Sequence, residues 1–565
     1  MRRTAAGLLL IAGLMPVDIA SVVVAQEAAD SSSDNGSALI DQSTLPTAIE
    51  SKGSRPQADP SVLPAAATTL PENLDALQAP PSLALPNQPD QVRIRELRPL
   101  SLSEVEQLAE INSPQLKAVA LQVQEAKAGL RASISSWYPT LNLRANGLPQ
   151  YLAGEQNFFD KDASSLTGLE AQEGRLTQFE RTSANFTAQL NWNLIDPSRV
   201  PQISAARDTF EKSRDAYLIA LRQLRLVVAK AYYDLQRYDE QVNVGKQSVM
   251  ASLISLRQAR ARFQAGVATK LEVLEAETQL SRDRDLLTNS LRLQRRARRN
   301  LAKITDLPQD VTPTAASPSR VVGLWEPSLQ ESIIAAYAFR EELDQFILDI
   351  SINNSNANAA LAAVQPVLGI YNNFTTSRTE SGESDGSSSA NSYQYGFDNA
   401  VGVSATWNFF DGGRARAQYK RNKLRAERSA YEFADQRGTI RLEVEHSFYN
   451  LKANQQTIRT ASRAVISQRE ALRLARLRFQ AGVTTQREVV DNQRDLTRAQ
   501  QTYVNAVADY NITIAELRRY TGLDQVVSCP DRDLPADKAQ PSASEVVPIE
   551  PSPIIPACDA SLLGS

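Results

Sequence analysis

Histidine and cysteine, the side chains most often used as nucleophiles, bases and metal ligands, are few in this 565-residue sequence and stand far apart. The single histidine is His446, and the only two cysteines are Cys529 and Cys558. Metal binding or histidine-based acid–base catalysis needs a cluster of such groups, so we expect His446 at a solvated position of a helix. The sequence also lacks a phosphate-binding loop and a nucleophile beside a base. We therefore expect no enzymatic activity, no bound metal and no cofactor.

Two pairs of carboxylates remain as candidates for a functional site. Glu272 and Glu275 lie three residues apart, and Glu488 and Asp491 repeat this spacing. Residues three apart share one face of a helix, so each pair presents two negative charges together. An acidic first turn is also favoured by the helix dipole. Two interpretations are therefore open, stabilisation of a helix end and attraction of cations.

Both carboxylate pairs belong to a segment that the sequence contains twice. Residues 262–280 read RFQAGVATKLEVLEAETQL, and residues 478–496 read RFQAGVTTQREVVDNQRDL. In each copy a long helical run ends at Gly266 or Gly482, because glycine readily takes the left-handed conformation that ends a helix. A second helical run starts directly afterwards. Each copy therefore predicts a helical hairpin with a tight turn.

The helical patterns have two lengths. Long patterns cover roughly 200–264 and 414–480, and at about 1.5 Å per residue each would extend about 100 Å. Shorter patterns at 101–136 and 269–304 would reach about half as far. Two short helices placed end to end would match one long helix, which predicts a wall of alternating long and stacked short helices. Apolar spacings of three and four indicate a coiled-coil seam. Its residues are Leu221, Leu224, Val228, Ala231, Leu235, Tyr238, Val242, Ile440, Val444, Ser447 and Leu451.

Two stretches predict strands with one apolar and one polar face. From Phe186 and again from Val401, apolar and polar residues alternate strictly for about ten residues, a length that crosses a bilayer. Trp192 and Trp407 stand near the ends of these stretches, as in the aromatic girdle of a membrane barrel. We expect both tryptophans to face lipid. A strand in a soluble sheet would show the same alternation, and a weaker partner strand precedes each stretch.

The strands of each pair are separated by long polar connections, at about 150–184 and 375–397, which we expect to be loops of the extracellular type. This makes four strands per chain, too few to close a barrel, and open sheet edges are not tolerated in lipid. The chain must therefore oligomerise if its strands span a membrane. Either two or three copies would supply enough strands.

The segments outside the repeats differ from them in composition. Arg2 and Arg3 precede an apolar run, and small residues end just before Gln26, which is the layout of a secretory signal over 1–25. No later stretch has the roughly 18 uninterrupted apolar residues of a membrane-spanning helix. Residues 26–99 and 525–565 are rich in Ser, Pro and Ala, and we expect them to be disordered. Cys529 and Cys558 both lie in the tail, where a disulfide is favoured over free thiols in an oxidising compartment.

The duplicated strand–helix halves, the Trp-Asn-x-x-Asp turns at 192–196 and 407–411, and the Arg-Phe-x-x-Gly-Val tips resemble the TolC family of outer-membrane efflux proteins. The resemblance implies a mainly α fold with long helical hairpins forming a periplasmic α-barrel. Four β-strands per chain would contribute to a shared outer-membrane β-barrel, with an internal two-fold repeat. It implies a homotrimer in outer-membrane lipid with a large periplasmic part. The partners would be a periplasmic adaptor, or membrane fusion protein, and an inner-membrane transporter.

The resemblance covers about 100–524. The boundaries expected are a signal peptide at 1–25, an arm at 26–99, a first repeat at 100–310 with its hairpin tip at 262–269, a linker at 311–327, a second repeat at 328–524 with its hairpin tip at 478–485, and a Pro-rich tail at 525–565.

The implied function is an exit duct for multidrug efflux, type I protein secretion, or both. A soluble periplasmic coiled-coil adaptor or scaffold is the alternative, because it would share the hairpins without needing lipid-facing strands. The balance of 61 basic and 64 acidic residues gives no indication of nucleic-acid binding. The cargo does not follow from the sequence, since a wide hydrated tube passes many solutes.

The resemblance places the hairpin tips at the periplasmic entrance of the channel. The family's entrance acids stand at the positions of Glu488 and Asp491, with Glu in place of Asp at the first. Together with Glu272 and Glu275, they would form a ring of acids that favours cations. The expected adaptor contacts are the turn residues, for which capping and local packing are the alternative. These residues are Arg262, Phe263, Gly266, Arg478, Phe479 and Gly482.

Overall fold

The computed structural model describes residues 63, 66–158, 175–384 and 389–528. The chain divides into two compact units, residues 1–50 and 51–565, and every described residue belongs to the second. The expected signal peptide, the first part of the arm and both cysteines lie outside the described residues. None of the described helices has a stretch long and apolar enough to cross a membrane.

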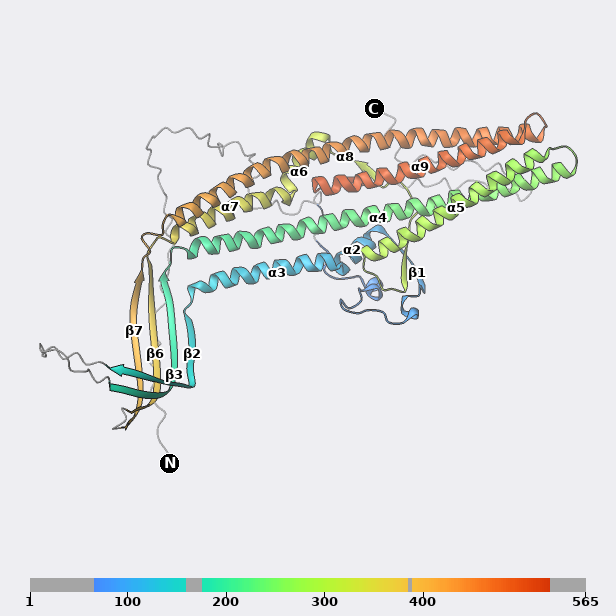
Figure 1. Cartoon of the computed structure of the whole chain (residues 1–565). Coiled ribbons are helices and arrows are strands. Elements are labelled where there is room, and N and C mark those ends of the chain that lie inside the picture. The colour runs from blue at the N-terminus through green and yellow to red at the C-terminus, as the bar shows by residue number, and fades with distance from the viewer. Residues whose placement is uncertain (1–62, 64–65, 159–174, 385–388, 529–565) are drawn as a thin grey trace, which may run out of the picture. The chain divides into compact units, whose positions relative to one another are not determined.

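The helices follow the same order in the two repeats (Figure 1). In the first repeat they are α2 (Leu102–Asn112), α3 (Pro114–Ile134), α4 (Arg199–Gln264) and α5 (Lys270–Ile304). In the second they are α6 (Leu329–Phe339), α7 (Glu341–Ala362), α8 (Arg414–Gln480) and α9 (Gln486–Thr521). The two long helices, the two hairpins and the internal repeat are thereby confirmed.

One expected helix is divided. The pattern over 101–136 predicts a single helix, but the structure breaks it between α2 and α3. Pro114 has no backbone N–H to donate and therefore favours the first position of a new helix. The hydroxyl of Ser113 accepts a hydrogen bond from the Leu116 backbone N–H and so caps α3. In the second repeat a break at the equivalent place separates α6 from α7 at Arg340, without a proline or a side-chain cap.

Four long strands form one antiparallel sheet in the order β2-β3-β6-β7. They are β2 (Thr140–Phe158), β3 (Arg175–Ile195), β6 (Val367–Ser384) and β7 (Ser389–Thr406). The polar connections expected at 150–184 and 375–397 were therefore wrong for most of their length, because these residues continue the strands. Backbone hydrogen bonds hold an antiparallel ladder together regardless of side-chain polarity, so polar composition did not end the strands.

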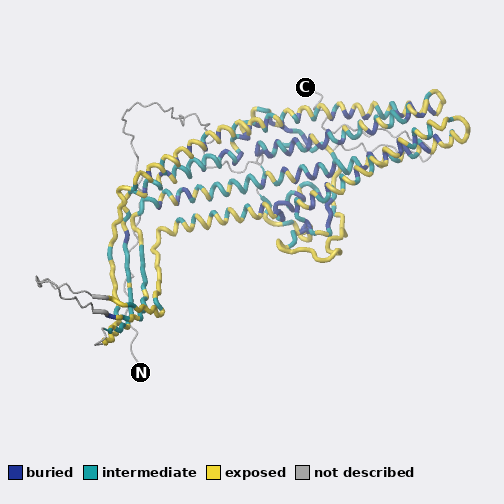
Figure 2. The backbone as a smooth tube through the Cα atoms, viewed as in Figure 1, coloured by how far each residue is buried: buried dark blue, intermediate teal, exposed yellow. Residues whose placement is uncertain are grey.

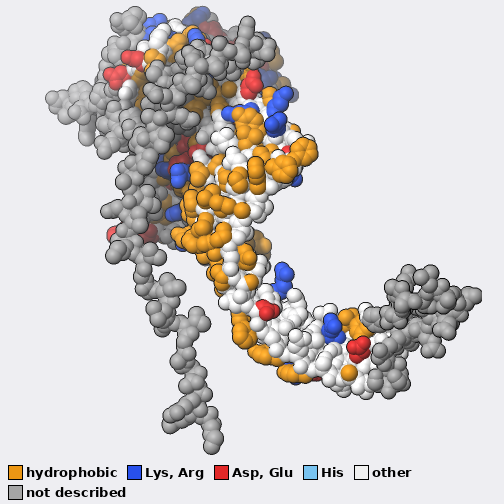
Figure 3. Space-filling model, turned by 90° about the vertical axis from the view of Figure 1, so that its left-hand side faces the viewer, with side chains coloured by type: hydrophobic (Ala, Val, Ile, Leu, Met, Phe, Trp, Pro, Cys, Tyr) orange, Lys and Arg blue, Asp and Glu red, His pale blue; other side chains and the backbone are white. Residues whose placement is uncertain are grey.

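The strand hairpins of the two repeats share one register. Thr140 lies opposite Asn191 in the first hairpin, and the counterpart residues Val367 and Thr406 lie opposite each other in the second. The sheet joins one end of the helices, and the two hairpin tips lie at the other end (Figure 1). Hydrophobic side chains gather along one face of the sheet (Figure 3). Val401 and Val403, two alternate residues of β7, are 68% and 74% exposed.

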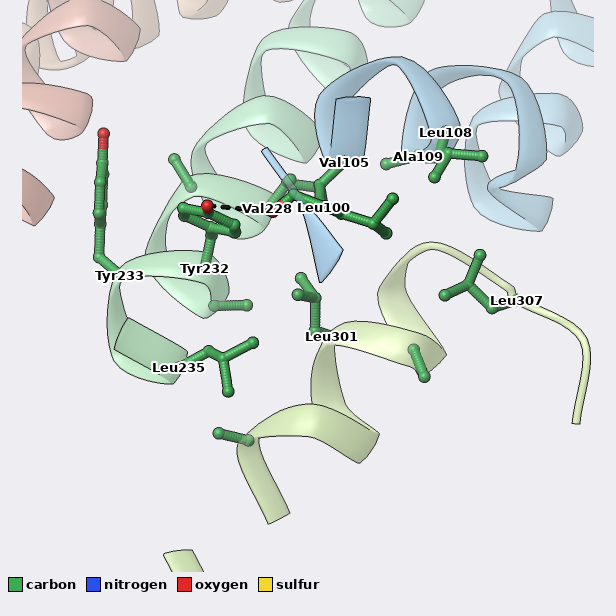
Figure 4. Packing of buried hydrophobic residues seen from close by; sticks show 14 of the residues in the cluster. Leu100, Val105, Leu108, Ala109, Val228, Tyr232, Tyr233, Leu235, Leu301 and Leu307 are labelled. Carbon is green, nitrogen blue, oxygen red and sulfur yellow. Dashed lines mark hydrogen bonds between the residues drawn. The ribbon is translucent and has the colours of Figure 1, made fainter. Parts of the chain in front are cut away.

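The larger clusters of buried residues lie between the helices near the middle of their length, and smaller clusters continue toward the hairpin tips (Figure 2). Helix α4 packs against α3, α5, α7 and α9, while α8 packs against α7 and α9. The expected seam residues Val228, Leu235, Ile440 and Val444 are all fully buried. In the first repeat the hydroxyl of Tyr232 donates to the Leu100 carbonyl across this core (Figure 4).

The arm is ordered where it approaches this core, contrary to the expectation of disorder over 26–99. It contains two short 3₁₀ helices, η2 (Glu72–Leu77) and η3 (Pro89–Val92), and the strand β1 (Glu96–Leu100). Leu74 and Leu77 are buried in the same cluster as α2 and α4. Burial of these leucines offsets the loss of chain entropy, which a compositional argument could not foresee.

Two small sheets close this region. β1 pairs in parallel with β4 (Val311–Ala315), inside the segment expected as a linker. β5 (Gly323–Trp325) pairs antiparallel with β8 (Val526–Ser528), at the start of the expected tail. The linker and the first residues of the tail are therefore parts of the fold.

Candidate functional site

The candidate site is built on the two hairpin tips. Each long helix ends with a glycine in the left-handed region, Gly266 and Gly482, both with φ of 75°. The Val267 backbone N–H donates to the Arg262 carbonyl at 3.0 Å, and Val483 donates to Arg478 at 2.9 Å. These bonds satisfy carbonyls that the helix end would leave unpaired. Both turns are thus the tight helix–helix connections that the repeated segment predicts.

The two tips make different contacts although their sequences match. The guanidinium carbon of Arg262 lies 4.3 Å from the ring centroid of Phe479, and Nη1 donates to the Phe479 carbonyl at 3.3 Å. Phe479 is 5% exposed, whereas its counterpart Phe263 is 46% exposed. Arg478 lies over no aromatic ring of the described residues and pairs instead with Glu488 at 2.9 Å. Within the described chain, the two tips are therefore joined by the Arg262–Phe479 pair and not by the equivalent pair of Arg478 and Phe263.

Three of the four expected entrance acids have separate local contacts, and the fourth, Glu275, is partly buried in α5. Glu272 forms a capping box with Thr269 at the start of α5. Glu488 accepts from Arg478 and from the Thr484 hydroxyl, and Asp491 pairs with Arg494 at 3.2 Å. Helix-end stabilisation therefore accounts for Glu272 directly. Exposed ion pairs contribute about 0–1 kcal/mol, so these pairings leave the acids available to solvent and ions.

A groove between the two hairpins was not predicted from the sequence. It has a volume of about 370 Å³ and lies directly beside the tips. Met250 and Ile254 of α4, Phe479 of α8, and Val490 and Gln493 of α9 are among its lining residues. Met250 and Ile254 are 60% and 47% exposed. Apolar residues on the outer face of a long helix were the feature of the sequence from which the groove could have been predicted.

The two tryptophans occupy equivalent positions at the helix end of the sheet. Trp192 donates its indole N–H to the Trp137 carbonyl, and Trp407 donates to the Val364 carbonyl, each at 3.0 Å. Trp192 and Trp407 are 38% and 63% exposed. A ring with one bonded polar end and an exposed apolar body suits a membrane–water interface. That both face lipid stays a prediction.

A charged network at the α6–α7 junction was also absent from the sequence prediction. Arg340 pairs with Glu342 at 3.0 Å and with Glu443 at 2.5 Å, and Arg519 pairs with Glu342 at 2.6 Å. Burial by itself raises the pKa of Glu342, but hydrogen bonds and charge from Arg340 and Arg519 outweigh it and lower the pKa to about 2. This network joins α6 and α7 to α8 and α9. Its residues lie far apart in the sequence, so no local pattern predicted it.

His446 lies at an exposed position of a helix, as the sequence predicts. It lies in α8, where Nδ1 is within hydrogen-bonding distance of the Asn450 side-chain amide. Among the residues that the structure describes, no group of histidine, cysteine and acidic side chains could hold a metal ion.

Known proteins resemble this chain over nearly all of its repeats. The family model "Outer membrane efflux protein" matches residues 105–306 and 335–523. "Outer membrane protein TolC" of Vibrio cholerae is 23% identical, over 75% of this chain and 90% of that protein. "Outer membrane protein OprJ" of Pseudomonas aeruginosa is 25% identical, over 73% and 81%. The crystal structure of the outer membrane protein VceC from V. cholerae has a TM-score of 0.58 at 16% identity, covering 75% of this chain and 96% of that one.

The family model covers more than half of the chain, and the fold of the described repeats is that of solved family members. A soluble adaptor or scaffold, the alternative left open by the sequence, is therefore set aside. Members of the family are outer-membrane channels that act as trimers and catalyse no reaction. The chain belongs to the outer membrane efflux protein family and is a TolC-type outer-membrane efflux channel with a large periplasmic helical part.

Proposed function

We propose that three copies of this chain form one duct from the periplasm through the outer membrane. An inner-membrane transporter would supply substrates and energy, and a periplasmic adaptor would join the transporter to the hairpin tips. The observation that carries this proposal is the four-stranded sheet, whose outer strands β2 and β7 each have one neighbour among the described residues. An unpaired strand edge is not stable in lipid, so equivalent sheets from other copies must complete it.

The proposed cargo is small toxic compounds, secreted proteins, or both. A deletion strain complemented with the wild-type gene tests this most directly. We expect the deletion to lower the inhibitory concentrations of several toxic compounds, or to abolish release of a protein into the medium. Complementation should restore the lost activity. If neither export changes, and the chain does not fractionate with the outer membrane, the duct proposal is wrong.

We further propose that Glu488 and Asp491 line the periplasmic entrance and favour cations. Both lie in the first two turns of α9 beside the tip, and their ion pairs are exposed. Replacing them together, as Glu488→Gln with Asp491→Asn, should reduce the cation preference of the channel in a planar bilayer. Glu470→Gln is the matched control, because Glu470 is an exposed acid of the preceding helix α8 that also pairs with an arginine, Arg473. An unchanged preference in the double variant would remove the proposed acidic ring.

The exposed turn residues of both tips are proposed as the adaptor contact, without Phe479, which is only 5% exposed. Val267 and Val483 are 64% and 69% exposed, so each turn presents an apolar side chain to solvent. Photo-cross-linking residues placed at Gln264 and Gln480 should capture a periplasmic partner in cells. Gln456, which is exposed in the middle of α8, is the control position and should capture none. Capture at Gln456 alone, or at none of the three, would leave capping as the role of the tips.

A further inference from the structure

The two hairpin tips of one chain differ in a way that their matching sequences do not explain. We call the α4–α5 pair hairpin 1 and the α8–α9 pair hairpin 2. The Arg262 side chain of hairpin 1 stacks on Phe479 of hairpin 2. In hairpin 2 the equivalent Arg478 folds back onto Glu488. Phe263, the ring equivalent to Phe479, has no cation over it among the described residues and is half exposed.

The N-terminal caps of α5 and α9, the second helices of the two hairpins, also differ. In hairpin 1, Glu272 is free of its arginine and forms a capping box with Thr269. In hairpin 2, Glu488 is held by Arg478, and the equivalent Thr485 makes no side-chain cap bond. The two hairpins therefore differ in three related features: the partner of the arginine, the exposure of the phenylalanine ring and the cap of the second helix. Hairpin 2 has the arrangement expected of a tip whose arginine lacks a ring to stack on.

We propose that the missing ring is supplied by a second copy of this chain, with Arg478 stacking on Phe263 of the neighbouring copy. This rests on the oligomeric duct proposed above and specifies its tip contact. Arg478 would leave Glu488, which would then cap α9 at Thr485 as Glu272 caps α5 at Thr269. The ring of hairpins would then alternate Arg262–Phe479 contacts within chains and Arg478–Phe263 contacts between chains.

The interface inside the chain supports this arrangement because it provides a template for the contact between copies. Helix α4 of hairpin 1 packs against α9 of hairpin 2. Bonds along this interface join Gln241 to Asn505 at 2.9 Å and Ser248 to Thr497 at 3.1 Å. In the repeat, α8 is the counterpart of α4, and α5 is the counterpart of α9. The equivalent interface between copies would therefore place α8 of one copy against α5 of the next.

The residues that this conversion brings together are chemically compatible. Thr457 is the counterpart of Gln241, and Asn289 is the counterpart of Asn505, so two exposed polar side chains would meet. Farther from the tip, Arg237 pairs with Asp509 at 2.6 Å within the chain. Their counterparts are Ala453 and Leu293, so two apolar side chains would lie opposite each other. None of these pairs brings like charges together. The outer face of α8 therefore fits α5 of a second copy.

A cross-linking experiment tests the proposed proximity. Phe263→Cys and Arg478→Cys are combined in a chain whose Cys529 and Cys558 are replaced by serine, and the oligomer is treated with a short bis-maleimide. Denaturing gels should then show linked dimers and trimers. Arg262→Cys with Phe479→Cys is the control, because this pair lies within one chain and should remain at the mass of a monomer.

The outcomes separate this inference from the proposed duct. An intact oligomer on unheated gels without linked chains at Phe263 and Arg478 would overturn the tip contact and leave the duct standing. A chain that forms no oligomer in detergent would overturn both.

A second measurement distinguishes an energetic contact from mere proximity. Arg478→Ala and Phe263→Leu should each lower the temperature at which the oligomer dissociates, and the double variant should lower it no further than either single variant. Arg262→Ala should affect dissociation less, because its contact lies within one chain. Far-UV circular dichroism confirms that each variant keeps its helices. Fully additive shifts, or equal effects of Arg478→Ala and Arg262→Ala, would contradict the proposal.

Discussion

Arg340 shows how single charged residues hold the helical part of this channel together. Its guanidinium is almost fully buried, and it binds carboxylates of α7 and α8, Glu342 and Glu443. Arg519 of α9 binds Glu342 from the other side. Removing one partner from a buried ion pair leaves an uncompensated charge, which is costly. This network is therefore needed for stability once it has formed.

The depressed pKa of Glu342 predicts acid sensitivity. Its pKa falls from 4.5 to about 2 on folding, so its contribution is fully present above pH 4.5 and is lost as the pH falls toward 2. Glu342→Gln should lower the free energy of unfolding at pH 7 by about 3 kcal/mol, and should weaken the acid dependence in that window. Thermal unfolding followed by circular dichroism at pH 7 and pH 3 measures both.

Glu106 provides the matched control, because burial, the largest influence, raises its pKa. Its ionised form is disfavoured in the fold, so Glu106→Gln should leave stability at pH 7 unchanged or slightly higher. Equal destabilisation by the two substitutions would show that loss of a carboxylate, rather than loss of the Arg340 and Arg519 pairings, governs the effect.

Capping residues and glycines determine where the helices of the repeat begin and end. Ser101 with Glu104, Thr269 with Glu272, and Ser328 with Glu331 form capping boxes at the starts of α2, α5 and α6. These Ser/Thr-x-x-Glu patterns are visible in the sequence and place helix starts to within one or two residues. Glycines in the left-handed region mark the ends of the long runs. Their surroundings, however, differ greatly.

Substitution of two such glycines should separate backbone strain from packing. Gly266 has a φ of 75° and open space where a Cβ would stand, so Gly266→Ala should cost only the strain, about 1 kcal/mol. Gly522 has a φ of 73°, and a Cβ there would lie 2.9 Å from the Phe339 Cβ and from Arg222 Nη1. Gly522→Ala should therefore cost about 3 kcal/mol or more. Thermal melts of the two variants measure the difference, and equal shifts would contradict the packing argument.

The internal repeat relates contacts within one chain to contacts between copies. Strand β3 pairs with β6, and the counterparts of these strands in the other repeat are β7 and β2. β7 and β2 are also the outer strands of the sheet. If copies assemble with the same geometry as the repeats, the β3–β6 register predicts the register between β7 of one copy and β2 of the next.

This register gives a specific disulfide. Leu190 lies opposite Asn372, and their counterparts are Ala405 and Ala145. Residues directly opposite in an antiparallel pair have Cβ atoms about 5 Å apart, within reach of a disulfide after modest adjustment. Ala145→Cys with Ala405→Cys, in a chain without the native cysteines, should yield linked trimers under oxidising conditions. Moving the second cysteine by one residue, to Thr406, should reduce linking, because alternate residues face opposite sides of the sheet. Equal linking at both positions would reject this register.

The sequence was sufficient to predict the strands and helical hairpins that depend on local periodicity and on the repeat. Strict alternation from Phe186 indicates a strand with one apolar face, and Gly266 ending a helical run indicates a hairpin, because both signals act over a few residues. The family resemblance rested on these signals and on their duplication.

Tertiary structure alone decided which distant groups meet. The length of the strands depended on backbone pairing, which polar side chains do not reveal. The burial of Leu74 and Leu77, the stacking of Arg262 on Phe479, and the network around Arg340 join residues that are far apart in sequence. Such contacts form only after the chain has brought several elements together, because each depends on the combined geometry of helices that no local pattern encodes.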